Sequence, residues 1–251
     1  PGHAYLFEAQ AGSWWVVRRA VRPGKTFFPR ANHLGRETFL APVEWDGDGW
    51  PVVNGNGTLT PEVQGPDFPL HPWPKSPERD DFNRPVLAPT WVHIRNPNPA
   101  QYSLSERSGW LRLRGGAATL ESREPVACVL RRQTAVVCRA ETLLEFAPAQ
   151  DGEEAGLTVL MNGSYHYCVF VAMQHGKLIA GLRLQVGDIT HMRASRELPG
   201  PAGSFRLAVE ADEKHYRFLA CCGDAPLEEL GSGLVRHLST EVAGGFTGVM
   251  V

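Results

Sequence analysis

The sequence predicts an all-β protein whose larger part, residues 91–251, is a β-sandwich. Three observations support this prediction: short apolar or alternating runs dominate, clusters of turn-forming residues separate them, and no long segment has the periodicity of a helix. The runs lie at 14–17, 110–113, 142–146, 155–161, 165–173, 177–186, 205–210 and 215–221. Short strands at such regular spacing are typical of sandwiches and barrels.

Three parts follow one another along the chain. Residues 1–60 offer only three or four strands, too few to make a domain alone. Eight prolines lie between positions 61 and 89, and proline neither donates to a β-ladder nor leaves its φ angle free, so residues 61–90 are expected to be an extended connector. Residues 91–251 carry most of the runs, and Leu111-Arg112-Leu113-Arg114 alternates there as a half-buried antiparallel strand does.

The composition excludes some function classes. The 251 residues carry a net charge of −2, with no basic block and no apolar run long enough to span a bilayer, so neither nucleic acid nor a membrane is expected as a partner. The five cysteines lack the spacing of metal ligands and are expected to be small buried side chains, with at least one unpaired. Sequons at Asn56 and Asn162 would permit glycosylation of a secreted protein, so extracellular and cytoplasmic locations both stay open.

A series of short motifs occurs along the chain in a fixed order. The first half contains Gly2-His3-Ala4, Trp14-Trp15, Arg22-Pro23, Leu34-Gly35-Arg36-Glu37-Thr38, Glu44-Trp45 and Asp48-Gly49-Trp50-Pro51-Val52. The second half contains Tyr102-Ser103-Leu104, Gly109-Trp110-Leu111-Arg112-Leu113, Arg131-Arg132-Gln133, Ala155-Gly156-Leu157 and Phe246-Thr247-Gly248. With these motifs, over nearly its whole length, the sequence resembles the C-terminal half of the β-xylosidases and arabinofuranosidases of glycoside hydrolase family 43.

The resemblance implies a five-bladed β-propeller that carries the active site, followed by a concanavalin A-like (jelly-roll) antiparallel β-sandwich. Residues 1–60 would be the last part of the propeller and residues 91–251 most of the sandwich. About four blades are then expected before Pro1, and further sandwich strands after Val251. On this view the chain alone exposes blade faces and an unpaired strand edge, which favours association.

The resemblance also implies the chemistry. Family members invert, using an Asp base, a Glu acid and a third Asp that tunes the acid, all in the earlier blades. No catalytic residue is therefore assigned here, and the chain alone is expected to be inactive. The complete protein would act on xylo-oligosaccharides or arabinoxylan fragments. No cofactor or metal site is expected in this chain, although Asp80-Asp81-Phe82 can help to bind calcium in complete family members.

Three residues are expected to contact the oligosaccharide substrate if the resemblance holds. His3 would point into the propeller channel near the sugar pocket; the alternative is a hydrogen-bonded core histidine. Arg36 would reach the floor of the site, where its guanidinium offers a rigid fork of donors; the alternative is a structural pair with Glu37. Phe246 would lie on a sandwich loop that walls the pocket; the alternative is an ordinary core phenylalanine.

Other residues keep a structural interpretation beside a functional one. The tryptophans expected mainly in the core, with sugar stacking as the alternative, are Trp14, Trp15, Trp45 and Trp50. Asp46-Gly47-Asp48-Gly49 indicates a hairpin turn, with metal binding the weaker alternative. Tyr165 and His166 favour a cross-strand aromatic cluster, or else a sugar platform. That platform would suit a second candidate function, a stand-alone lectin-like carbohydrate-binding module. A third candidate is an inactive product of a decayed gene, and the oligomeric state stays open.

Overall fold

The computed structural model describes residues 2–10, 12–24, 30–65, 69–75, 77–200 and 203–251. The chain forms two compact units: unit 1 comprises Pro1–Arg22 and Arg36–Arg79, and unit 2 comprises Pro23–Gly35 and Asp80–Val251. Residues 23–35, expected with the first part of the chain, therefore belong to unit 2. The connector expected over 61–90 is divided between the units, and its positions 66–68 and 76 lie outside the described residues.

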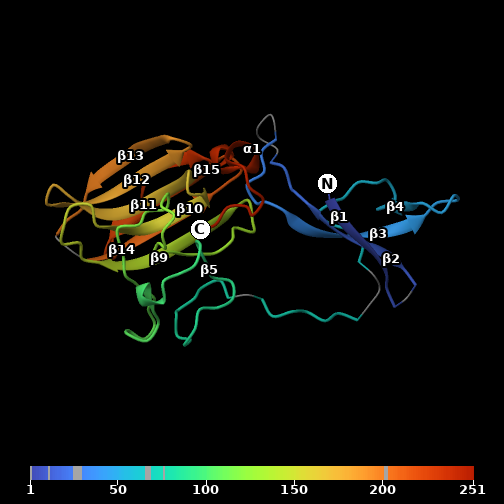
Figure 1. Ribbon diagram of the computed structural model, residues 1–251, viewed down its shortest axis with the longest axis horizontal. Helices are drawn as coiled ribbons and strands as arrows, with labels where there is room; N and C mark the ends of the chain where they lie inside the picture. Colours follow the sequence, from blue (N-terminus) through green and yellow to red (C-terminus); the bar gives the residue numbers. More distant parts are fainter. Residues whose placement is uncertain (1, 11, 25–29, 66–68, 76, 201–202) are drawn as a thin grey trace. The chain divides into compact units, whose positions relative to one another are not determined.

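Unit 1 is built on one antiparallel sheet with the strand order β1-β2-β3-β4 (Figure 1). Its strands are β1 (Gly2–Glu8), β2 (Trp14–Ala20), β3 (Glu37–Trp45) and β4 (Pro51–Val53). One face buries Val16, Ala41 and Val43. On the other face Tyr5, Val17 and Leu40 form one cross-strand row, and Tyr5 and Leu40 are exposed. The second face is therefore only partly open, because Trp15 on it is buried.

The turn between β3 and β4 is the one that the sequence predicts. The Asp46 carboxylate accepts hydrogen bonds from the amides of Asp48 (3.0 Å) and Trp50 (2.8 Å). These bonds turn the chain back on itself, as Asp side chains commonly do. Asp46 therefore has a structural role here.

Unit 2 contains two four-stranded antiparallel sheets (Figure 1). The first has the order β10-β11-β12-β13, and the second has the order β16-β15-β14-β9. Their strands are β9 (Cys138–Phe146), β10 (Glu154–Asn162), β11 (Tyr165–Gln174), β12 (Lys177–Val186), β13 (Ile189–Glu197), β14 (Gly203–Ala211), β15 (His215–Cys222) and β16 (Glu228–Leu234). The described residues form only three short helical segments, η1 (Pro99–Gln101), η2 (Val235–Leu238) and α1 (Thr240–Ala243), which confirms the all-β prediction. No helix in these described ranges is long and apolar enough to cross a membrane.

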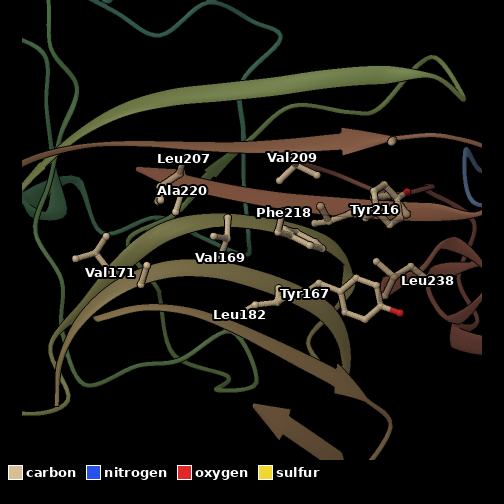
Figure 2. Packing of buried hydrophobic residues seen from close by; sticks show 14 of the residues in the cluster. Tyr167, Val169, Val171, Leu182, Leu207, Val209, Tyr216, Phe218, Ala220 and Leu238 are labelled. Carbon is tan, nitrogen blue, oxygen red and sulfur yellow. The ribbon is translucent and has the colours of Figure 1, made fainter. Parts of the chain in front are cut away.

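The main core lies between the two sheets. Figure 2 shows Tyr167, Val169 and Leu182 of the first sheet facing Leu207 and Phe218 of the second. Because side chains alternate along a strand, each sheet presents every second residue to this layer. The packing confirms the predicted sandwich.

Strand β11 is buried on both faces, which explains its unbroken apolar run. Tyr167, Val169 and Val171 point into the main core, whereas Cys168 and Phe170 belong to a second cluster against which Leu120 packs. A strand covered on both sides needs apolar residues at every position rather than at alternate ones. Residues before β9 therefore form part of the covering of the first sheet.

The region before β9 has less regular structure than the sequence predicts. It contains two short pairs, β5 (Val92–His93) with β8 (Val129–Leu130) and β6 (Tyr102–Ser103) with β7 (Arg112–Leu113). The half-buried strand expected at 111–114 is wrong in extent, because only two of its residues pair and Leu113 is exposed. Alternation alone does not create a strand where no long partner is available.

The last three residues pair on both sides. Met250 exchanges backbone hydrogen bonds with Leu160 of β10, at 2.8 Å in each direction, and Val251 exchanges bonds of 2.7 and 2.8 Å with Arg131. The amide of Gln133 donates to the carbonyl of Val249 at 3.0 Å. This segment therefore covers the β10 ladder around Leu160.

All five cysteines are free thiols, and Cys168 and Cys221 are buried. Burial raises the pKa of the Cys128 thiol to about 12 and that of Cys168 to about 11. A neutral buried thiol behaves as a small apolar side chain, as the sequence predicts for most of the five.

Replacing Phe218 with alanine is expected to lower the free energy of unfolding of unit 2 by about 3–5 kcal/mol, the usual effect of emptying a buried aromatic site. Phe218 is 0% exposed between the two sheets. Urea unfolding followed by circular dichroism measures the change. The control is Leu143→Ala at an exposed position of β9, expected to change stability by less than about 0.5 kcal/mol. Equal effects at both positions would contradict the assigned core.

Candidate functional site

His3 lies on a β-bulge at the start of β1. The register with β2 shifts between Gly2 and Ala4, and His3 has a φ of 55°. A residue other than glycine in this left-handed region costs about 1–3 kcal/mol, and a bulge re-aims the side chain that it carries. The His3 side chain is exposed. Within this chain the His3 ring is therefore accessible.

Arg36 is exposed and directly precedes β3. The alternative interpretation paired it with Glu37, but both Glu37 carboxylate oxygens accept hydrogen bonds from Arg22. Nε and Nη2 of Arg22 each lie 2.7 Å from a Glu37 oxygen. This contact raises the pKa of the Arg22 guanidinium. Glu37 therefore has a structural partner at the base of the β2–β3 connection, where the chain leaves unit 1 and returns to it.

His3 and Arg36 lie at the same end of the unit 1 sheet. Gly2 is opposite Arg19, and Ala20 is opposite Glu37, so the end of β2 lies between the two candidates. Neighbouring strands are about 4.8 Å apart and Arg36 lies two to three residues further along β2 than His3, which puts the two backbones roughly 12–13 Å from each other.

The chain just before Arg36 is anchored in unit 2. The carbonyl of Asn32 accepts from the Thr240 amide, and that of His33 accepts from the Val249 amide, both at 2.8 Å. Nη2 of Arg132 donates to the Leu34 carbonyl at 2.6 Å. Residues 31–35 are all buried. Local sequence patterns cannot reveal this anchoring, because every partner lies about a hundred residues or more away.

A buried polar cluster lies beside the anchor. The hydroxyl of Tyr216 donates to Oε1 of Gln133 at 2.8 Å, and Nε2 of Gln133 donates to the Ala135 carbonyl at 2.8 Å. The His33 ring packs edge-on against Tyr216, with 6.3 Å between ring centroids. Gln133 belongs to the Arg131-Arg132-Gln133 motif. The sequence therefore singled out one residue of this cluster but did not predict its hydrogen bonds.

Phe246 lies in the loop between α1 and the terminal segment, within unit 2. Its side chain is 61% exposed in this chain. Gly244, Gly245 and Gly248 all have positive φ angles, which residues other than glycine adopt only with strain. The loop therefore has a backbone conformation that depends on its glycines, and it carries the exposed ring of Phe246.

Several other candidates have structural roles. His166 is 1% exposed, and its Nε2 lies 3.2 Å from Glu121, so it is no part of a sugar platform. Trp15 is buried, whereas Trp14 packs edge-on against Trp45 with 5.3 Å between centroids, and Trp50 is exposed. The core interpretation holds for Trp15 and fails for Trp50.

Asp80 is occupied by protein groups. Its Oδ2 accepts from the Trp91 indole at 2.7 Å, and its Oδ1 accepts from the Phe82 amide at 2.9 Å. These hydrogen bonds, the indole bond foremost, lower the pKa of the Asp80 carboxyl. Within the described ranges no group of three or more His, Cys, Asp and Glu side chains is arranged to hold a metal ion.

Comparison with known proteins identifies the family. The model of the beta xylosidase C-terminal concanavalin A-like domain matches residues 79–251, and that of glycosyl hydrolases family 43 matches residues 1–51. The chain belongs to glycoside hydrolase family 43. This membership agrees with the resemblance seen in the sequence, and it confirms the expected architecture of propeller strands followed by a sandwich.

Individual family 43 proteins are similar over the whole chain. The non-reducing end alpha-L-arabinofuranosidase BoGH43B of Bacteroides ovatus is 38% identical over 100% of this chain and 46% of its own. A solved Bacteroides ovatus family 43 structure, from a xyloglucan utilisation locus, superposes with a TM-score of 0.92 at 38% identity, over 99% of this chain and 48% of its own. The xylan beta-1,4-xylosidase of Bacillus halodurans C-125 gives a TM-score of 0.90 at 32% identity, over 99% and 48%. The chain spans about half the length of the relatives that it matches.

Proposed function

We propose that the chain supplies the C-terminal part of a glycosidase that acts on xylo-oligosaccharides or arabinose-decorated xylan fragments. The likeness that carries the proposal extends over nearly the whole chain and includes an arabinofuranosidase and a xylosidase. Because the likeness covers both units, it favours an enzyme part over a stand-alone lectin-like module. The burial of His166 also keeps this residue from contributing to a sugar platform.

The proposed chemistry needs two carboxyl groups on opposite sides of the glycosidic bond. In an inverting enzyme one protonates the leaving oxygen while the other activates a water molecule on the opposite face of the sugar. In the proposal these groups belong to the part of the full-length protein that corresponds to the other half of the relatives. The present chain contributes sugar contacts and needs no cofactor for that role.

His3 and Arg36 form the proposed sugar-binding pair of unit 1. Both are exposed at one end of the sheet, and the bulge at His3 has the strain that often accompanies a functional side chain. The Arg36 guanidinium offers planar donors that match sugar hydroxyls or a carboxylate. An arginine near the catalytic acid also influences the pKa of that acid.

Phe246 is the proposed contribution of unit 2. An exposed phenylalanine on a glycine-rich loop offers an apolar surface to the face of a sugar ring. Such a contact discriminates between substrates by length and shape rather than by chemistry. Its role in the proposal is to wall one side of the substrate.

Full-length wild-type protein is expected to release 4-nitrophenol from an aryl β-xyloside or an aryl arabinofuranoside at about 1 per second or faster. Replacing Phe246 with alanine is expected to raise KM for a xylo-oligosaccharide about two- to tenfold, the loss of one aromatic contact. The control is Ile189→Ala at another exposed apolar position of unit 2. Absence of turnover on both glycosides would contradict the enzyme proposal, and an unchanged KM would remove Phe246 from the substrate contacts.

A further inference from the structure

The backbone at Gly248 lies so close to Leu34 and Gly35 that neither glycine has room for a Cβ atom. A Cβ atom added to Gly35 would lie 2.4 Å from the Gly248 nitrogen, and one added to Gly248 would lie 2.2 Å from the Leu34 carbonyl oxygen. Both φ angles are positive, at 74° and 77°. Distances this short to backbone atoms exclude any side chain at either position. We call this crossing, together with residues 31–34 and 249–251, the glycine clasp.

Hydrogen bonds surround the glycine clasp on several sides. In addition to the three anchoring bonds described above, the Asn32 amide donates to Oε2 of Glu241 at 2.6 Å, and Nδ2 of Asn32 donates to the Gly35 carbonyl at 3.3 Å. Met250 follows on the far side and pairs with β10. The clasp therefore connects the backbone of Asn32, His33 and Leu34 to the sandwich.

Asn32 of the clasp and the adjoining Ser239 and Thr240 carry features that stability alone does not favour. Oδ1 of Asn32, Oγ of Ser239 and Oγ1 of Thr240 are buried without a hydrogen-bond partner among the described residues. Each such group costs about 1–3 kcal/mol relative to a satisfied one. Departures of this kind from the rules of stable folding concentrate at functional and strained sites.

The clasp lies next to both proposed ligand contacts in the chain. Arg36 is the residue after Gly35, and Phe246 precedes Gly248 by two residues. A displacement at the crossing is transmitted to both through one or two peptide units. Neither glycine offers a side chain to a substrate, so any role in the reaction is indirect.

Resting on the function proposed above, we propose that Gly35 and Gly248 are positioning residues that set the backbone from which Arg36 and Phe246 extend. In this assignment the sandwich unit supports activity by holding the connection between two strands of unit 1. The reason is geometric, because contacts misplaced by about 1 Å can lower a rate by about a hundredfold.

The test compares Gly248→Ala with Gly244→Ala. Gly244 lies in the same loop at a φ of 75°, and nothing lies within 4 Å of its added Cβ, so both variants place alanine at a positive φ and only Gly248→Ala adds the steric clash. A third variant, Val209→Ala, lowers the stability of the sandwich from a buried core position. Its melting temperature is the reference for a purely structural loss.

The first readout is amide hydrogen exchange at Val249 and Thr240, whose amides donate to His33 and Asn32. Exchange is expected to be roughly tenfold faster or more in Gly248→Ala than in Gly244→Ala. The second readout is kinetic and uses the full-length protein. There kcat/KM is expected to fall about a hundredfold in Gly248→Ala and to stay near the wild-type value in Val209→Ala.

Two outcomes would overturn the assignment. Unchanged exchange in Gly248→Ala would show that the crossing does not hold the segment. Faster exchange with kinetics equal to those of Gly244→Ala would show that the held segment does not position the site. A wild-type protein that is inactive on both pentosides would instead contradict the proposed function, and with it the positioning of a substrate site. The exchange comparison would still show whether the two glycines hold residues 31–35.

Discussion

Replacing Arg36 with alanine in the full-length protein is expected to lower kcat/KM for an aryl xyloside or arabinofuranoside by about a hundredfold or more, the usual loss when one charged or hydrogen-bonding donor leaves an active site. The side chain is exposed at the end of the unit 1 sheet, and the neighbouring Glu37 keeps its own partner, Arg22. Steady-state kinetics on both glycosides measures the effect, and thermal unfolding verifies the fold.

Two variants sharpen this test. Arg36→Lys keeps the charge but loses the planar fork, so it is expected to recover only part of the activity. Arg112→Ala removes an exposed arginine that pairs with Glu106 in unit 2 and is expected to leave the kinetics unchanged. Wild-type kinetics in Arg36→Ala would exclude Arg36 from the site.

The 251 residues prepared alone are expected to hydrolyse neither an aryl xyloside nor an aryl arabinofuranoside at a measurable rate. The family 43 model matches only residues 1–51, and the chain spans about half of its relatives, so the proposed acid and base belong to the other half.

The same preparation is expected to self-associate as its concentration rises, because Tyr5, Phe7 and Leu40 are exposed on one face of the unit 1 sheet. Size-exclusion chromatography and a glycosidase assay on the same fractions measure both.

The variant that tests association carries both Tyr5→Glu and Leu40→Glu. Charge on that face is expected to weaken the contact between copies of the chain. The full-length protein assayed in parallel is the activity control. A monomer of the 251 residues that turns over either substrate at about 1 per second would show that a catalytic pair lies within this chain.

The sequence by itself determined the fold class and the family. Short apolar runs separated by turn residues predict strands because alternation and turn chemistry are local properties, and the long strands of unit 2 confirm them. The motifs around His3, Arg36 and Phe246 are also local, so the resemblance could be recognised before any contact was known. The continuous apolar run of β11 indicates a strand that is buried on both faces. The structure shows what covers its second face, where Leu120 packs against the cluster of Cys168 and Phe170.

Only the tertiary structure decided how the candidate residues are held. Glu37 could have paired with its neighbour Arg36, but the fold brings Arg22 to both of its oxygens. Residues 31–35 look like part of a strand connection, yet they are built into the sandwich by Thr240, Arg132 and Val249. Met250 covers part of an edge that seemed open. Some of these contacts join groups from distant parts of the chain, and in others one of two chemically equivalent partners forms the pair. Local propensity specifies neither kind of contact, because both depend on the packing of the whole core.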